Sequence, residues 1–299
     1  MIAQRRLRVG VLSPPPVLDD GSTLGCTAED LVRAGRTQTA RLFRRFGGAG
    51  VHICAALSHP QPETPAGPGP RASVIALFPV SNCRSGNVLL KELAARGVCV
   101  DHVTRCSGRM RRNLVLEFRD RELVVEDSAS RAAPETDYDL RPIADLEWLL
   151  VSGALHPAVL RSAAAAAAEH RVLWSWNPSC SQGDRGNLLK ELAPGAELLQ
   201  LAAHEAARCA GVRIGTEPGV VATALQELTA ARSVIVTCGT AGAVGRDPRG
   251  RLARCPTPHW GASSAAATEA RFFALVNRAL WTAEKSLADA LRWAAVNLS

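Results

Sequence analysis

The sequence predicts an α/β protein with a mostly parallel central sheet and helices on both faces of that sheet. Short apolar runs typical of β-strands alternate along the chain with longer runs of helical period. Such alternation is typical of parallel strands joined by helices. The second observation is size: a chain of 299 residues, 47% of them hydrophobic, can bury a large core without disulfide or metal staples.

The individual elements follow from the spacing of the apolar residues. The predicted strands cover residues 7–12, 73–78, 148–152, 172–176, 197–201 and 233–238. The predicted helices cover residues 51–58, 86–96, 156–169, 185–192, 203–210 and 217–230, and two more follow at 267–282 and 285–297.

Two segments depart from the alternation of strands and helices. Residues 112–126 alternate apolar and polar side chains on both sides of Arg119-Asp120-Arg121, which predicts a β-hairpin. Because a lone hairpin is marginally stable in water, we expect it to lie over the body as a lid. Residues 59–70 are rich in proline and glycine and predict a surface loop. We expect residues 1–299 to form a single domain.

Composition argues against several classes of protein. No run of about eighteen uncharged apolar residues occurs, so we expect no membrane span. The apolar run after the first residues is too short for a signal peptide, and we expect a cytoplasmic protein. The nine cysteines are scattered without a C-x-x-C pair, which favours reduced thiols over a disulfide framework. For the same reason we predict no metal site.

The formal net charge of +7 raises the question of a nucleic-acid partner. Of the 35 basic residues only three are lysines, so 35 − 3 = 32 are arginines spread along the chain. The densest stretch, residues 109–112, has no aromatic residues among its arginines for stacking on bases. Nucleic-acid binding is therefore not favoured, although an arginine-rich subunit of a nucleoprotein assembly stays open as an alternative.

Several short motifs follow one another in a fixed order. Glycines at the entrance of a helix let a ligand approach the backbone and the positive end of the helix dipole, but they also serve close packing. The motifs are the turn Gly47-Gly48 before an apolar helix, the run G-N-V-L-L-K-E-L from Gly86, Trp176-Asn177-Pro178 at a strand end, Glu205-Ala206 at a helix start, I-V-T-C-G-T-A-G-A over residues 235–243, and Phe272-Phe273 in a late helix.

In order and spacing these motifs resemble the ribokinase-like (PfkB) family of carbohydrate and nucleoside kinases, over roughly residues 7 to 296. The resemblance implies a three-layer α/β/α sandwich with a small β lid, and phosphorylation of a sugar or nucleoside hydroxyl by ATP and Mg²⁺. It also implies site residues. These are Thr237, Gly239, Gly242, Glu205 and Asn177 for the nucleotide, and Gly47, Gly48 and His52 for the substrate. The glycines can instead serve their turns, and Glu205 can be a surface helix residue.

The sequence departs from the family's pattern at the catalytic motif G-A-G-D. Aligned backwards from Phe272-Phe273, this motif falls on Ala267–Ala270, so Ala270 replaces the aspartate that acts as base in the family. Glu269 replaces the glycine before it, in the family's anion hole. A second register places residues 261–264 on the motif and also lacks the aspartate. We therefore name no catalytic residue.

Other positions that touch ligands in the family are also changed. His52 stands for an asparagine after the glycine turn, and Asn82 and Cys83 stand for two acids. Ser175 and Ala202 replace two more polar residues of the family's motifs. The first strand runs into three prolines, and the sequence does not decide whether Asp19 or Asp20 reaches the site.

Turn glycines and core residues are thus retained while ligand-binding side chains are lost. We expect a kinase-like protein without phosphotransfer activity, which binds a protein partner or a small metabolite or dimerises through its lid. On this hypothesis ATP and Mg²⁺ are needed only if some activity survives. The alternative is an active sugar or nucleoside kinase in which Glu269, Asp19 or Asp20 replaces the lost base.

Overall fold

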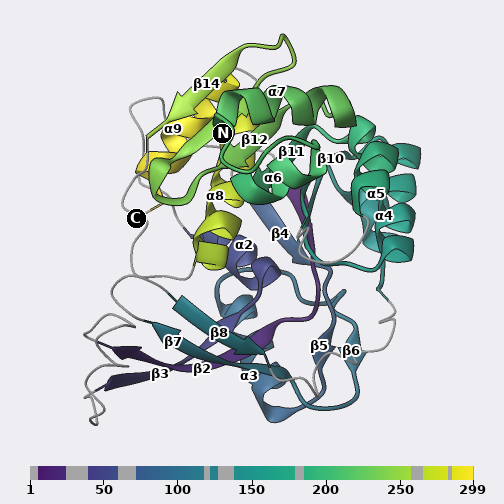
Figure 1. Cartoon of the computed structure of the whole chain (residues 1–299). Helices are drawn as coiled ribbons and strands as arrows, with labels where there is room; N and C mark the ends of the chain where they lie inside the picture. Colours follow the sequence, from purple (N-terminus) through teal and green to yellow (C-terminus); the bar gives the residue numbers. More distant parts are fainter. Residues whose placement is uncertain are drawn as a thin grey trace, which may run out of the picture.

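A computed structural model describes residues 6–24, 40–59, 72–117, 122–126, 138–178, 185–256, 265–281 and 285–298. The chain forms a body around a large sheet, with a smaller sheet projecting from one end of it (Figure 1). We call the smaller sheet the lid.

The large sheet has the strand order β14-β13-β12-β11-β10-β9-β1-β4. The six strands from β12 to β4 are parallel, and β13 and β14 extend the sheet in antiparallel pairing. The strands are β1 (Leu7–Leu12), β4 (Ala72–Ala76), β9 (Trp148–Gly153), β10 (Leu173–Pro178), β11 (Leu198–Ala202), β12 (Val234–Thr237), β13 (Ala243–Arg246) and β14 (Leu252–Cys255). The mostly parallel sheet is confirmed.

Helices cover both faces of this sheet (Figure 1). Its parallel strands are apolar on both sides because each side meets a helix layer, which gives two separate apolar clusters. One cluster includes α2 (Ala49–Ser58), α3 (Arg84–Ala95), α8 (Ala265–Leu280) and α9 (Leu287–Val296). The other includes α4 (Pro157–Glu169), α5 (Arg185–Leu192), α6 (Ala203–Cys209) and α7 (Pro218–Thr229).

Helix boundaries follow from the local sequence. Helix α7 begins with Pro218 at its first turn, where the missing proline N–H costs nothing, and the Glu217 side chain accepts from the Val220 N–H. It ends at Ala230, which takes the left-handed conformation with φ 51°. Every helix predicted from the apolar period is present within a few residues of its expected bounds. Short 3₁₀ turns connect other elements: η2 (Arg141–Asp145), η3 (Ala193–Gly195) and η4 (Gly239–Ala241).

The lid is a four-stranded sheet of order β3-β2-β7-β8. Strands β7 (Arg111–Glu117) and β8 (Glu122–Glu126) pair antiparallel over the segment where a hairpin is predicted, while its centre at 118–121 lies outside the described residues. The hairpin does not stand alone. It continues into β2 (Val17–Leu24) and β3 (Ala40–Gly47), which the sequence did not predict as strands.

Two short paired strands flank α3 along the chain: β5 (Val80–Ser81) precedes the helix, and β6 (Arg105–Cys106) lies between the helix and β7. Within the described part of the chain, no helix is long and apolar enough to cross a membrane. The seven described cysteines carry no disulfide bond. Of the proline- and glycine-rich loop predicted at 59–70, all but His59 lies outside the described residues.

Candidate functional site

Polar side chains meet where strands β11 and β12 end and helix α8 begins. The Thr237 hydroxyl, at the last position of β12, lies 3.1 Å from Oε1 of Glu269 and donates to it. The Gln200 side chain of β11 donates its Nε2–H to the Glu269 backbone oxygen at 3.1 Å. Both contacts hold the start of α8 against the carboxyl ends of two parallel strands, where ligands of open α/β sheets bind.

The Glu269 carboxyl has a raised pKa of about 7. Burial is the main cause, because it disfavours the charged form, and the nearby Glu205 carboxylate adds to it. The hydrogen bond from Thr237 acts in the opposite direction but is outweighed. Near pH 7 this carboxyl is therefore about half protonated, a state that its sequence position did not predict.

Ala270, which aligns with the family's catalytic base, lies in the apolar cluster of α2, α8 and α9 and is 1% exposed. Its methyl group can neither accept a proton nor bind a metal ion. Phe272 and Phe273 are buried in the same cluster, so α8 is held in place by its apolar side. The second register at 261–264 lies outside the described residues.

The glycines after β12 form a tight turn around η4. Gly239 has φ 55° and Gly242 has φ 92°, a range that L side chains rarely adopt. A Cβ built on Gly239 would have no heavy atom within 4 Å, so its outer side faces open space. Asn177 lies near the carboxyl end of β10, two strands from β12 in the same sheet. The structure thus brings Thr237, Glu205 and Glu269 together. Asn177 lies apart from them on β10, two strands from Thr237 on β12.

A second group of candidates lies where the lid meets α2. Gly48 caps α2 with φ 99° and packs against Pro16, which follows the end of β1. A Cβ on Gly47 would lie 2.3 Å from Oδ2 of Asp19, so only glycine lets this carboxyl approach the turn. Gly47-Gly48 and the Gly239–Gly242 turn therefore belong to the same edge of the large sheet, at the carboxyl ends of parallel strands.

The structure separates the two aspartates of the lid. Asp19 is 8% exposed, accepts from Nδ2 of Asn113 at 3.0 Å, and has the guanidinium of Arg45 3.8 Å away. Burial raises the pKa of Asp19, although Asn113 and Arg45 both act to lower it. Asp20 points to the other face of the strand and pairs with Arg44 and Arg112. Of the two acids, Asp19 is the one beside Gly47. Strand register decides this, which is why the sequence alone did not.

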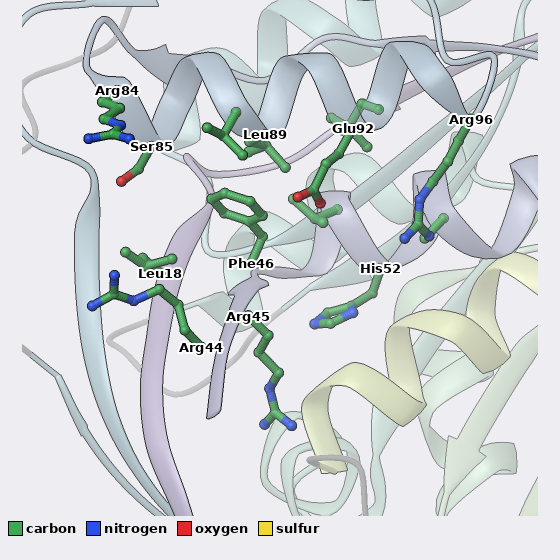
Figure 2. Close-up of a pocket in the computed structure, with 14 residues that line it drawn as sticks. Leu18, Arg44, Arg45, Phe46, His52, Arg84, Ser85, Leu89, Glu92 and Arg96 are labelled. Carbon is green, nitrogen blue, oxygen red and sulfur yellow. The ribbon is translucent and has the colours of Figure 1, made fainter. Parts of the chain in front are cut away.

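His52, the third substrate-binding candidate, lines a groove between the lid, α2 and α3 (Figure 2). Burial, and after it the nearby charges of Arg45 and Arg271, lower the pKa of His52 to about 4, so the imidazole is neutral at physiological pH. Among the described residues no group of three His, Cys, Asp or Glu side chains is arranged to hold a metal ion. Arg45, Asn113 and Arg271 were not singled out from the sequence, since only the cross-strand register and the packing of α8 bring them here.

Comparison with known proteins agrees with this architecture. The sequence model of the family described as pfkB family carbohydrate kinase matches residues 24–259. No sequence among the curated proteins matches the chain at a significant level.

Solved structures cover almost the whole chain. A ribokinase from Arabidopsis thaliana complexed with ribose and ATP has a TM-score of 0.73 and 17% identity, over 98% of this chain and 91% of that one. A ribokinase from Cryptococcus neoformans in complex with ADP has a TM-score of 0.71 and 18% identity, over 97% and 92%. The phosphofructokinase-2 from Escherichia coli has a TM-score of 0.68 and 18% identity, over 97% and 91%. At these identities the likeness shows the fold.

Proposed function

The chain belongs to the pfkB family of carbohydrate kinases, and from that premise we propose that it is a non-catalytic member, a binding protein that no longer transfers phosphate. The observation that carries this proposal is the pair Glu269–Ala270 at the start of α8. A methyl group stands where the family has its base, and a carboxyl group stands beside it, hydrogen-bonded to Thr237. The sequence difference is thus also a difference in the chemistry of the cleft.

Phosphoryl transfer needs positioned groups that neutralise negative charge and a group that orients the nucleophile. Glu269 supplies charge of the wrong sign whenever it is ionised, and in the register aligned from Phe272-Phe273 it replaces the family's glycine, which leaves space for the phosphate. Ala270 cannot orient a hydroxyl group. The turn keeps its glycines, and a Cβ at Gly239 would meet no atom within 4 Å, so the backbone there is open to a ligand. The residues present therefore fit a bound nucleotide better than they fit its reaction.

The chain also lacks carboxylates that could bind magnesium at the family's acidic motif. The two acids of the family's motif are Asn82 and Cys83, and the Asn82 side chain accepts from Arg105 at 3.1 Å. A guanidinium next to this position repels a divalent cation. We derive no step through a magnesium ion.

The test is an assay of ADP formation with ATP, Mg²⁺ and a panel of sugars and nucleosides. We expect product below ~10⁻² of ordinary kinase turnover, because loss of a positioned base alone costs ~10²–10⁴ in rate. Turnover at ordinary rates of ~1–100 per second would overturn the proposal.

A second candidate function has one specific observation in its favour. A carboxyl with a pKa of about 7, next to the position of the lost base, is in the range that suits a general base. In this alternative the chain is an active sugar or nucleoside kinase and Glu269 accepts the hydroxyl proton.

The variant Glu269→Gln separates the two functions. If the chain only binds, removing the charge increases its affinity for ADP and leaves ADP formation undetectable. If Glu269 is the base, the same variant abolishes an ADP formation that the native chain shows. The matched control is Glu227→Gln on the exposed side of α7, which should change neither measurement.

A further inference from the structure

The groove that contains His52 is a candidate binding site in its own right. It has a volume of about 870 Å³ and is lined by residues of β2, β3, α2 and α3. This volume lies in the range of small-molecule sites, ~300–1,000 Å³. Figure 2 shows α3 along one side of the groove, with β3 and His52 on the other.

The lining of the groove is basic. Four of its residues are arginines, Arg44, Arg45, Arg84 and Arg96, and one is an acid, Glu92. His52 adds no charge near neutral pH, because its pKa is about 4. The lining has a net charge of 4 − 1 = +3, which two acids next to it, Asp20 paired with Arg44 and Asp19 3.8 Å from Arg45, reduce to 3 − 2 = +1. A groove with this excess of positive charge attracts anions.

The positive charge is strongest where α3 begins. Arg84 is the first residue of this helix, so its guanidinium lies near the positive end of the helix dipole. The neighbouring Cys83 is also in a positive environment. Burial acts to raise the pKa of its thiol, but backbone N–H groups and the charge of Arg105 outweigh burial and lower this pKa below its ordinary value. Arg44 lies on the same side of the groove in Figure 2. This end suits a phosphate group, which arginine binds through paired hydrogen bonds.

The floor of the groove is apolar between its charged ends. Leu89 and Leu93 of α3 are buried, and Phe46 of β3 packs against the same cluster. Val88 is 42% exposed on the groove side of α3. Arg96 closes α3 twelve residues after Arg84, which corresponds to ~18 Å along the helix axis. A compact inorganic anion would fill one end of this length, whereas an elongated molecule would use all of it.

We propose that this groove binds an elongated organic phosphate, with a phosphate group at Arg84 and the start of α3 and its apolar arm or ring system along Val88 and Leu89. The lining of this site includes neither Glu269 nor Thr237, so the site is separate from the start of α8. The inference does not depend on whether phosphotransfer has been lost.

The test is isothermal titration of the full chain with coenzyme A, ADP and inorganic pyrophosphate, without magnesium. Coenzyme A and ADP carry a pyrophosphate joined to an apolar or aromatic body, and pyrophosphate supplies the charge alone. We expect at least one organic phosphate to bind ~10-fold or more tightly than pyrophosphate, because its body covers apolar surface. Failure of both to bind more tightly than pyrophosphate overturns the proposal.

Two variants locate the binding. Arg84→Gln should weaken the organic phosphate by ~10-fold or more, since a charge-assisted hydrogen bond is lost. Arg161→Gln on α4, an equally exposed arginine on the other face of the large sheet, should leave the affinity unchanged. Val88→Ser should weaken coenzyme A or ADP and leave pyrophosphate unaffected. Because Glu269→Gln is expected to change the affinity for ADP at the other site, the decisive ligand is coenzyme A. An affinity for coenzyme A that Arg84→Gln does not change places the ligand elsewhere and overturns the proposal.

Discussion

Single residues at the start of α8 determine the chemistry of the candidate site at the ends of β11 and β12. Glu269 has a folded-state pKa of about 7 against an ordinary value of 4.5. A carboxyl that holds its proton more tightly in the folded chain destabilises that chain as the pH rises from about 4.5 to about 7. This destabilisation is fully developed above about pH 7, and it is absent below about pH 4.5.

Glu269→Gln should therefore stabilise the protein at pH 8 by ~2–3 kcal/mol, at ~1.4 kcal/mol per pKa unit, and have a small effect at pH 5. Urea unfolding at both pH values measures this difference. Glu227→Gln, on an exposed position of α7, should change the unfolding free energy little relative to the native chain at either pH. Equal effects of Glu269→Gln at pH 5 and pH 8 would contradict the raised pKa.

Restoring the family's aspartate at Ala270 should not restore a kinase. Ala270 is 1% exposed within an apolar cluster, so Ala270→Asp places a carboxyl in a site without polar partners. We expect a loss of ~2 kcal/mol or more in unfolding free energy and no ADP formation, because Glu269 remains beside it. Ala270→Ser is the control and should lose less stability. Full activity of Ala270→Asp would show that its carboxyl reaches the cleft.

The sequence predicted the positions of these residues but not their state. The motif order placed Thr237, Glu205 and Glu269 near one nucleotide loop, and the fold brings them together at the ends of β11 and β12. The hydrogen bond from Thr237 and the raised pKa depend on burial that arises only in the folded chain. The same holds for Asp19, whose partner Asn113 lies 94 positions away along the chain.

At the scale of elements, the parallel strands were predictable because they are apolar over their length, and the helices because their apolar residues recur at helical spacing. Strands β2 and β3 were not. Their sequences, V-L-D-D-G-S-T-L and A-R-L-F-R-R-F-G, are rich in charged and small residues. These charges are satisfied across strands, by Asp19 with Arg45 and Asp20 with Arg44. Such pairing is invisible until the register is known.

Gly86 shows that a motif glycine can serve packing alone. A glycine inside a helix usually costs ~1 kcal/mol relative to alanine. On α3, however, a Cβ at this position would lie 2.0 Å from the Ser81 carbonyl oxygen. Gly86→Ala should therefore destabilise the protein by ~1–3 kcal/mol, measured by urea unfolding. Lys91→Ala on the exposed side of the same helix should be close to neutral. If Gly86→Ala were more stable than the native chain, the Ser81 backbone of β5 would have to move away from the added Cβ at little energetic cost.

Ala230 offers the opposite case. It ends α7 in the left-handed conformation, where an L residue with a Cβ is strained by ~1–2 kcal/mol and glycine is not. Ala230→Gly should raise the unfolding free energy by ~0.5–1 kcal/mol. The same substitution within α7, Ala224→Gly, should lower it by ~1 kcal/mol. If both variants lose stability, the strain at Ala230 is already relieved.

At the scale of the whole molecule, the lid exposes apolar side chains that the expected dimer would cover. Leu114 of β7 and Val125 of β8 are register partners on one face of the lid, and each is about half exposed. Neighbouring exposed apolar residues on a sheet are costly unless they are covered.

We expect a dimer at micromolar concentration, and Leu114→Asp should convert it to monomers without lowering the thermal midpoint. Light scattering with size-exclusion chromatography measures the mass of each species. Leu173→Asp, on the similarly exposed start of β10, is the control and should leave the dimer intact. A monomeric native chain would contradict the prediction.

The antiparallel strands β13 and β14 also affect the tendency of the protein to aggregate at high concentration. If the large sheet ended at β12, this apolar parallel strand would offer unpaired backbone groups to other chains. Here the outermost strand is only four residues long, and Arg254 on it pairs with Glu217. Arg251 precedes the strand and Pro256 follows it, and each of these residues disfavours a further strand. The short hairpin of β13 and β14 thus disfavours the addition of strands from other chains at this edge of the large sheet.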